Sequence, residues 1–391
     1  MKTIGRLSLV LVAGATSATA SYQDVINFFV GEQSGTSFPV QGRGLADVES
    51  AFGPRIQTSG GNYDWHRGID IDGTDGSDLV QAVLPGYLHR YSWESSSSGY
   101  TTILRHELSD FGVPSLTYGG RTITRFYTWY SHLSDDGVDN NGVGTGDLYM
   151  DAFADGDPIP QGTVIGILGS SGTPANGGSY GPHLHFELRV GTNASLQFQL
   201  ANPDTTQWGF DPHINPMILF DPAVLAPGVS SNQTLQSLIP AAPGASLQIR
   251  YANSSDLLPL LNRVEVEVIH TQSNTTVKSH LLDFDQRVGY DASTTALLDT
   301  RDFAAPYIDP LAFGDTATQF QSDIRVPAAW LASYETPVHT LRVTATDLYG
   351  SAVQLDLALV PEPSLPGLVI FATAFLLVRL HIRKSRCWVR A

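Results

Sequence analysis

Two short stretches of the sequence carry histidines at spacings that could do chemistry. In HRGID, His66 and Asp70 are four residues apart, and in GPHLHFEL, His183 and His185 are two apart. Residues two or four apart lie on one face of a β-strand, so these side chains can converge on an ion. Imidazole and carboxylate groups are suitable donors for zinc. An HxxxD pair alone is more typical of a surface ion pair, and a lone strand histidine of a structural residue.

A third histidine, His132, ends the β-like run WYSHL. A catalytic zinc takes three protein donors and keeps one position open for water. His66, Asp70 and one histidine of the HxH pair supply that number. His132 and the other histidine of the pair remain for acid–base work near neutral pH. The spacing alone leaves open whether His183 or His185 is the metal donor.

The segments around these histidines predict strands. Runs such as YTTILRHEL and TVIGILG are apolar, short and bounded by turn residues. In HLHFEL the alternation points His183, His185 and Glu187 to one face and the apolar residues to the other. Further along the chain, VEVEV at 264–268 has the strict alternation of half-buried strands in a β-sandwich. This second region contains no close grouping of metal-ligand residues, which favours an accessory or binding role.

Composition excludes several classes of function. The net charge is −16, and such an acidic chain is a poor binder of nucleic acid, because neutralising phosphates requires clustered Lys and Arg. The single cysteine, Cys387, rules out an intramolecular disulfide and a CxxC zinc site. The stretch GSSG at 169–172 lacks the GxSxG spacing of a serine hydrolase.

Both ends of the chain are typical of an exported protein. Lys2 and Arg6 precede a run of apolar and small residues, and ATA at 18–20 is a small-x-small cleavage site, which predicts a signal peptide at 1–20. Near the other end, PEP at 361–363 is followed by an apolar run and a basic tail. On its own this order predicts a simple membrane anchor. It resembles the PEP-CTERM sorting signal of Gram-negative bacteria, which implies processing by an exosortase-type enzyme and a cell-envelope location, with at least transient membrane anchoring.

From Phe52 to Pro216 the sequence also resembles the M23 family of zinc metallopeptidases, of the lysostaphin and LytM type. The ordered motifs are FGPR at 52–55, HRGIDI at 66–71, QAVLPGYL at 81–88, YSHL at 130–133, GDPIPQGTVIGILGSSG at 156–172, GPHLHFEL at 181–188 and INP at 214–216. The resemblance implies a Zn²⁺ ion held by His66, Asp70 and His185. It implies His132 and His183 as catalytic residues, and the peptide stems or cross-links of bacterial peptidoglycan as substrate.

The other histidines of this region are expected to be structural (His89 and His213) or to be structural or supporting (His106). Two long excursions, at 108–126 and 134–154, depart from the compact family pattern and are expected beside the substrate groove. The second is rich in Asp, Asn and Gly, and either binds calcium or is an ordinary polar loop. The alternatives to a peptidase are a non-cutting M23-like protein that binds cell wall or regulates another hydrolase, and a surface-matrix protein.

The sequence therefore predicts a mainly β chain, with an antiparallel-sheet M23-type peptidase domain followed by a β-sandwich-like accessory domain. The expected segments are a signal peptide at 1–20, a lead-in at 21–50, the peptidase domain at 51–220, a linker at 221–245, the accessory domain at 246–358 and the sorting signal at 360–391.

Overall fold

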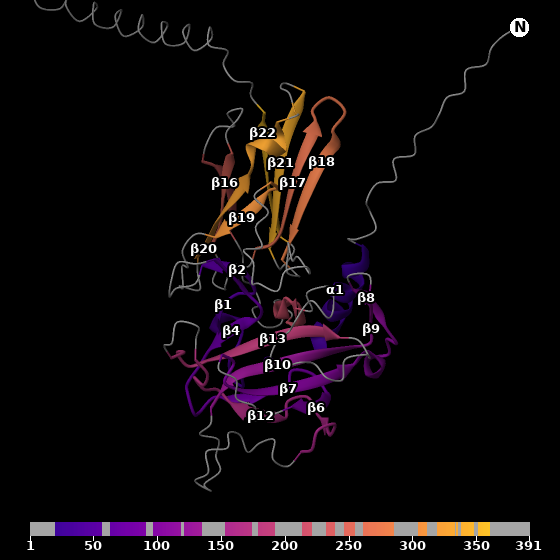
Figure 1. The fold of residues 1–391 in the computed structure, drawn as a ribbon, viewed down its shortest axis with the longest axis vertical. Coiled ribbons are helices and arrows are strands. Elements are labelled where there is room, and N and C mark those ends of the chain that lie inside the picture. The colour runs from indigo at the N-terminus through magenta and orange to yellow at the C-terminus, as the bar shows by residue number, and fades with distance from the viewer. Residues whose placement is uncertain are drawn as a thin grey trace, which may run out of the picture.

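The structure of the chain is a computed structural model. It describes residues 20–56, 63–90, 97–118, 121–134, 153–173, 179–191, 213–220, 232–238, 246–254, 261–284, 304–310, 319–332, 334, 338–347 and 351–359. Antiparallel strands dominate these residues, so the predicted mainly β fold class is confirmed (Figure 1). Nearly all of the predicted signal peptide, the sorting signal and most of the 134–154 excursion lie outside them. No helix within the described part of the chain has the length and apolar character needed to cross a membrane.

The first unit is built on an antiparallel sheet with the strand order β1-β4-β13-β10-β7-β6-β11, and β14 pairs with β13. These strands are β1 (Val48–Ser50), β4 (Ile69–Asp72), β6 (Gly86–Arg90), β7 (Tyr100–Glu107), β10 (Arg125–Leu133), β11 (Pro158–Ile159), β13 (His183–Gly191) and β14 (His213–Ile214). The smaller strand pairs are β2 (Gly53–Ile56) with β3 (Tyr63–His66), β5 (Leu79–Gln81) with β12 (Val164–Ile167), and β8 (Leu116–Tyr118) with β9 (Arg121–Ile123). The helical segments are α1 (Ala20–Glu32), η1 (Gln33–Gly35), η2 (Leu45–Asp47), η3 (Leu108–Phe111) and η4 (Pro216–Leu219).

One face of the main sheet packs against an apolar core, to which the N-terminal lead-in also contributes side chains. The segment VINFFV, whose pattern fits either a strand or a helical turn, belongs to helix α1. Phe28 and Phe29 are buried on its inner side and contact Phe126 of β10 at ring-centroid distances of 5.9 and 5.1 Å. Tyr130 and Phe186, both fully buried, continue this core along β10 and β13. The lead-in also supplies β1, which pairs with β4 at the edge of the sheet.

The excursion at 108–126 does not wall the predicted site, so the expectation for this segment is wrong. Strands β7 and β10 run antiparallel, with Glu107 opposite Arg125 at one end and Tyr100 opposite Leu133 at the other. The excursion joins the Glu107 end, whereas His132 lies at the opposite end of the nine-residue strand β10. It forms η3 and the β8–β9 hairpin, which packs on α1. The location of the excursion depends on the direction of the two strands that it joins, which the sequence of a single segment does not reveal.

The second unit contains two four-stranded antiparallel sheets, in the orders β15-β16-β20-β19 and β18-β17-β21-β22. Its elements are β15 (Asn232–Ser237), β16 (Leu247–Ser254), β17 (Leu261–His270), β18 (Thr275–Asp283), β19 (Tyr307–Pro310), β20 (Gln319–Val326), α4 (Ala328–Leu331), β21 (His339–Asp347) and β22 (Ala352–Ala358). Ile249 and Ile324 from one sheet, and Val266 and Val343 from the other, are fully buried. The alternation in VEVEV therefore marks a buried row, as predicted.

Strand β15 corrects the predicted linker at 221–245. Residues 232–237 pair with β16 in full register, from Asn232 opposite Ser254 to Ser237 opposite Ile249. Their sequence, NQTLQS, is almost entirely polar, because β15 is an edge strand whose side chains are exposed or only half-buried. Such a strand has little apolar signal for a sequence pattern to detect.

Candidate metal centre

Three neighbouring strands bring the predicted metal donors together. His66 is the last residue of β3, Asp70 lies on β4 and His185 lies on β13. Asp70 and His185 are direct partners in the β4–β13 pairing, so their side chains share one face of the sheet. The turn between His66 and Asp70 then places the second imidazole beside this pair. The described residues contain one group of three or more His, Cys, Asp or Glu side chains that could hold a metal ion, and it is this one.

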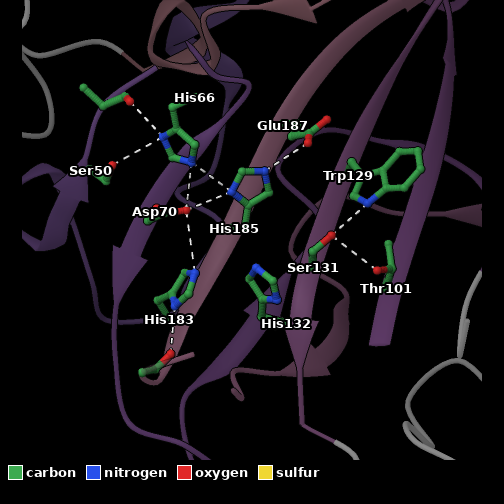
Figure 2. A network of polar contacts seen from close by, with 12 residues as sticks. Ser50, His66, Asp70, Thr101, Trp129, Ser131, His132, His183, His185 and Glu187 are labelled. Atoms are coloured by element: carbon green, nitrogen blue, oxygen red, sulfur yellow. Dashed lines mark hydrogen bonds and ion pairs between the residues drawn. The ribbon is translucent and has the colours of Figure 1, made fainter. Parts of the chain in front are cut away.

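The three donor atoms form a compact triangle (Figure 2). His185 Nδ1 lies 2.8 Å from Asp70 Oδ1, and His66 Nε2 lies 3.1 Å from each of those two atoms. His66 is 3% exposed and Asp70 is 9% exposed, so little water reaches them. Two nitrogens and a carboxylate oxygen at these separations fit the common coordination sphere of a single cation.

The hydrogen bonds at the back of each ring explain why the triangle suits a cation. His66 Nδ1 donates to the carbonyl oxygen of Ala51 at 2.8 Å, and His185 Nε2 donates to Glu187 Oε1 at 2.9 Å. When both rings are neutral, each has only one N–H, so the remaining nitrogens, His66 Nε2 and His185 Nδ1, present lone pairs. These lone pairs face a carboxylate oxygen of Asp70, and only a proton or a metal ion can satisfy all three acceptors.

Glycine is required in the HRGID turn because the chain passes very close to β13. A Cβ atom at Gly68 would lie 2.4 Å from the carbonyl oxygen of Phe186 and 3.0 Å from His185 Cε1. A larger residue would displace either the turn or the His185 ring. The absence of a side chain at Gly68 thus allows His66 to reach the donor triangle.

His132 and His183 lie beside the triangle, and each ring is anchored in the same way. His132 Nδ1 donates to the carbonyl oxygen of Ser171, and His183 Nδ1 donates to that of Gly181, both at 2.8 Å. The ring centroids of the two histidines are 4.7 Å apart, and His183 Nε2 lies 3.7 Å from Asp70 Oδ1. The structure thus brings all five predicted site residues together.

The backbone at His132 is strained and redirects its side chain. His132 has a φ angle of 62°, in the left-handed region that non-glycine residues rarely adopt. The β10–β7 register shifts between Tyr130 and Leu133, which is a bulge at this point, and the His132 amide donates to the Ser98 carbonyl at 2.9 Å. Bulges commonly re-aim a side chain next to a functional site. Burial and the nearby His183 and His185 rings lower the pKa of His132 to about 3, which keeps the imidazole neutral.

The charges around the triangle favour a bound cation. Burial alone would raise the pKa of Asp70, but the His66 and His185 rings reverse this effect and hold it well below its usual range. Burial would likewise lower the pKa of His185, yet hydrogen bonds to Asp70 and Glu187 raise it to about 9. Asp70 therefore stays ionised, and the carboxylates favour a positive charge at His185 Nδ1, which a proton supplies in the metal-free protein and a metal ion supplies when it replaces that proton.

Several residues at the site were given no chemical role by the sequence prediction. The ring of Tyr180 lies 4.1 Å from that of His132, between centroids, and covers it. Glu187 is buried, and Arg189 and the other surrounding groups hold its pKa well below the usual range, despite burial, which acts to raise it. His213, expected to be structural, has its Nε2 atom 3.4 Å from Glu187 Oε2. The strand alternation in HLHFEL places Glu187 on the same face as His185, whereas nothing in the sequence pattern indicates the carbonyl groups that hold the rings.

The remaining predicted histidines lie away from the centre. His106 is fully buried on β7, donates through Nδ1 to the Pro85 carbonyl at 2.8 Å and stacks on Phe126 at 4.5 Å. Burial lowers its pKa to about 4. His89 contacts Tyr127 at 5.4 Å between ring centroids. Both therefore have packing contacts of the structural kind that was expected.

The fold and the site together define a mainly β protein with a candidate metal centre of two histidines and one aspartate, flanked by two further histidines. No protein-family model matches the chain, and no curated protein matches it.

Proposed function

We propose that the chain is an exported zinc metalloendopeptidase that hydrolyses peptide bonds, in the peptide stems or cross-links of bacterial peptidoglycan. The observation that carries this proposal is the convergence of His66 Nε2, Asp70 Oδ1 and His185 Nδ1 within 3.1 Å of one another. Donors bound at about 2.0–2.2 Å to a tetrahedral zinc ion lie roughly 3.3 Å apart, so the triangle needs only a slight expansion. A site with three protein donors leaves the fourth zinc position for water, which suits catalysis rather than a purely structural metal.

When bound, zinc supplies Lewis-acid polarisation of a carbonyl oxygen and makes water more acidic. The protein's own contribution is to hold and move protons. His132 and His183 each commit Nδ1–H to a backbone carbonyl, so Nε2 is the atom that accepts a proton from an attacking water and returns it to the leaving amine. Burial and the neighbouring rings lower the pKa of His132, so its Nε2 is unprotonated at neutral pH and is able to accept a hydrogen bond from water.

Export and envelope attachment belong to the same proposal. A protein that acts on peptidoglycan has to leave the cytoplasm, which agrees with the predicted signal peptide. The sorting signal predicted at 360–391 further implies that an exosortase-type enzyme processes the protein and that the protein is anchored at the membrane at least transiently.

The test uses the purified full-length protein. We expect about one zinc per chain by elemental analysis, and release of soluble peptides from isolated cell walls that stops when a chelator is added. His66→Ala should abolish both. His270→Ala, a matched change of a half-exposed histidine in the second unit, should alter neither. A protein without zinc, or a zinc-loaded protein that cuts no cell wall and no peptide, would overturn the proposal. Wall binding without release would favour the non-cutting alternative.

A further inference from the structure

The polar face of β13 continues beyond the metal donors. Glu187 follows His185 by two residues, and Arg189 follows Glu187 by two more, so the three side chains share one face. Glu187 accepts from His185 Nε2 at 2.9 Å through one oxygen and from the Arg189 guanidinium through the other. The guanidinium carbon of Arg189 in turn lies 3.8 Å from the centre of the Trp129 ring on β10. Figure 2 shows Glu187 on the side of His185 that faces away from Asp70.

This arrangement is buried and firmly held. Glu187 is 5% exposed and Arg189 is 4% exposed. A buried carboxylate is stable only when it is paired and hydrogen-bonded, and Arg189 provides both. His213 of β14 lies within 3.4 Å of the same carboxylate. The Glu187 side chain therefore has little freedom to leave the His185 ring.

The position of Glu187 decides which nitrogen of His185 is a donor to a metal. Without an acceptor at Nε2, the ring could adopt the other tautomer and donate Nδ1–H to Asp70 Oδ1, which is only 2.8 Å away. That hydrogen bond would occupy both atoms and close the donor triangle. With Glu187 in place, Nε2 keeps its proton, so Nδ1 is the nitrogen whose lone pair becomes available when a metal ion replaces the proton between it and Asp70.

We propose that Glu187, held by Arg189 and Trp129, is a positioning residue that fixes His185 in the metal-binding tautomer and thereby sets the affinity of the centre for its metal ion. This inference rests on the metal centre of the proposed function but not on peptide cleavage. Carboxylate partners of metal-binding histidines typically change metal affinity by about 10–100-fold.

The experiment measures the Zn²⁺ dissociation constant of the full-length protein by competition with a chromophoric chelator. Glu187→Gln removes the charge at nearly constant volume and should weaken binding by roughly 10-fold or more. The double variant Glu187→Met with Arg189→Met removes the acceptor without leaving a buried charge unpaired, and should weaken binding by roughly 100-fold. Thermal unfolding of the metal-free proteins checks that each variant is folded, and the Co²⁺ absorption spectrum reports the altered donor set.

The matched control is Glu107→Gln on β7. Glu107 also pairs with an arginine, with Arg105 Nε at 3.0 Å, but it lies at the end of the β7–β10 pair opposite to the end that carries His132. The Glu107→Gln variant should leave the zinc affinity unchanged. Wild-type affinity in both Glu187 variants would overturn this inference and leave the proposed function intact. A wild type that binds zinc tightly but cuts nothing would overturn only the proposed activity.

Discussion

Histidine rings lie close together in both units of this protein, but only those of the first unit belong to a candidate metal centre. In the first unit, the rings of His66 and His185 have centroids 4.9 Å apart. In the second unit, His270 of β17 and His339 of β21 are direct cross-strand partners with centroids 5.7 Å apart. Proximity of imidazoles is therefore not what separates the two regions.

The difference lies in what surrounds the rings. Asp70 is buried between the first pair, and each ring uses its N–H at the back, so the lone pairs converge on the carboxylate. In the second pair, the Ser273 amide donates to His270 Nδ1 at 3.3 Å, and both rings are partly exposed. Within the described part of the chain, no third donor joins that pair. The first pair thus has two features that the second lacks, convergent lone pairs and a carboxylate shielded from water.

The largest effects should follow removal of a donor. His185→Ala or His66→Ala should lose the bound zinc and, with it, any cell-wall hydrolysis. In wild type, free zinc at a thousandfold excess over its dissociation constant should stabilise the folded protein by about 4 kcal/mol, and this gain should vanish in the variants. Elemental analysis and thermal unfolding with and without zinc measure both effects. Full zinc occupancy in His66→Ala would show that the triangle is not the metal centre.

The next effects separate holding the metal from using it. His183→Ala and His132→Ala should each lower the rate of peptide hydrolysis by about 10²–10⁴-fold, the usual contribution of an acid–base group, while most of the zinc remains bound. The reason is that neither residue belongs to the donor triangle. Hydrolysis rates and zinc content of the same samples provide the comparison. Loss of zinc in His183→Ala would contradict this division of roles.

A smaller effect concerns folding and pH at His106. Its pKa is about 4 in the folded protein against 6.5 for the unperturbed side chain, because burial disfavours the charged ring. The unfolded chain therefore binds more protons between these values, and stability is lost as pH falls from about 6.5 to 4, by about 3 kcal/mol for this group. His106→Gln cannot take up that proton, so its stability should fall less over the same range. Urea unfolding at several pH values tests this, and equal pH slopes would contradict it.

Much of the candidate site could be read from the sequence because strand alternation is local. The HLHFEL pattern correctly places His183, His185 and Glu187 on one face, and the motif order anticipates that HRGID and YSHL meet there. The acid–base roles of His132 and His183 stay predictions. The fold class was predictable for the same reason, since short alternating runs between turns allow few other architectures.

What the sequence could not reveal depends on contacts between distant segments. The carbonyl groups of Ala51, Ser171 and Gly181 hold three rings, and a carbonyl has no residue-type signature. The bulge at His132 arises from register between strands. The location of the 108–126 excursion depends on which end of β10 it joins, and the polar strand β15 forms only because β16 offers an edge.

The smallest expected effect completes the comparison between the two histidine pairs. The double variant His270→Gln with His339→Gln should leave zinc content and hydrolysis unchanged, because those rings do not present converging lone pairs to a carboxylate. Its stability should change by no more than about 0.5 kcal/mol, as is usual for substitutions of partly exposed side chains. If the second unit bound zinc and this double variant abolished that binding, two histidines would be sufficient for a metal site. The two regions would then not differ in the way argued above. If the double variant keeps its zinc while His66→Ala loses it, the difference between the regions is explained by the buried carboxylate and the anchored rings of the first unit.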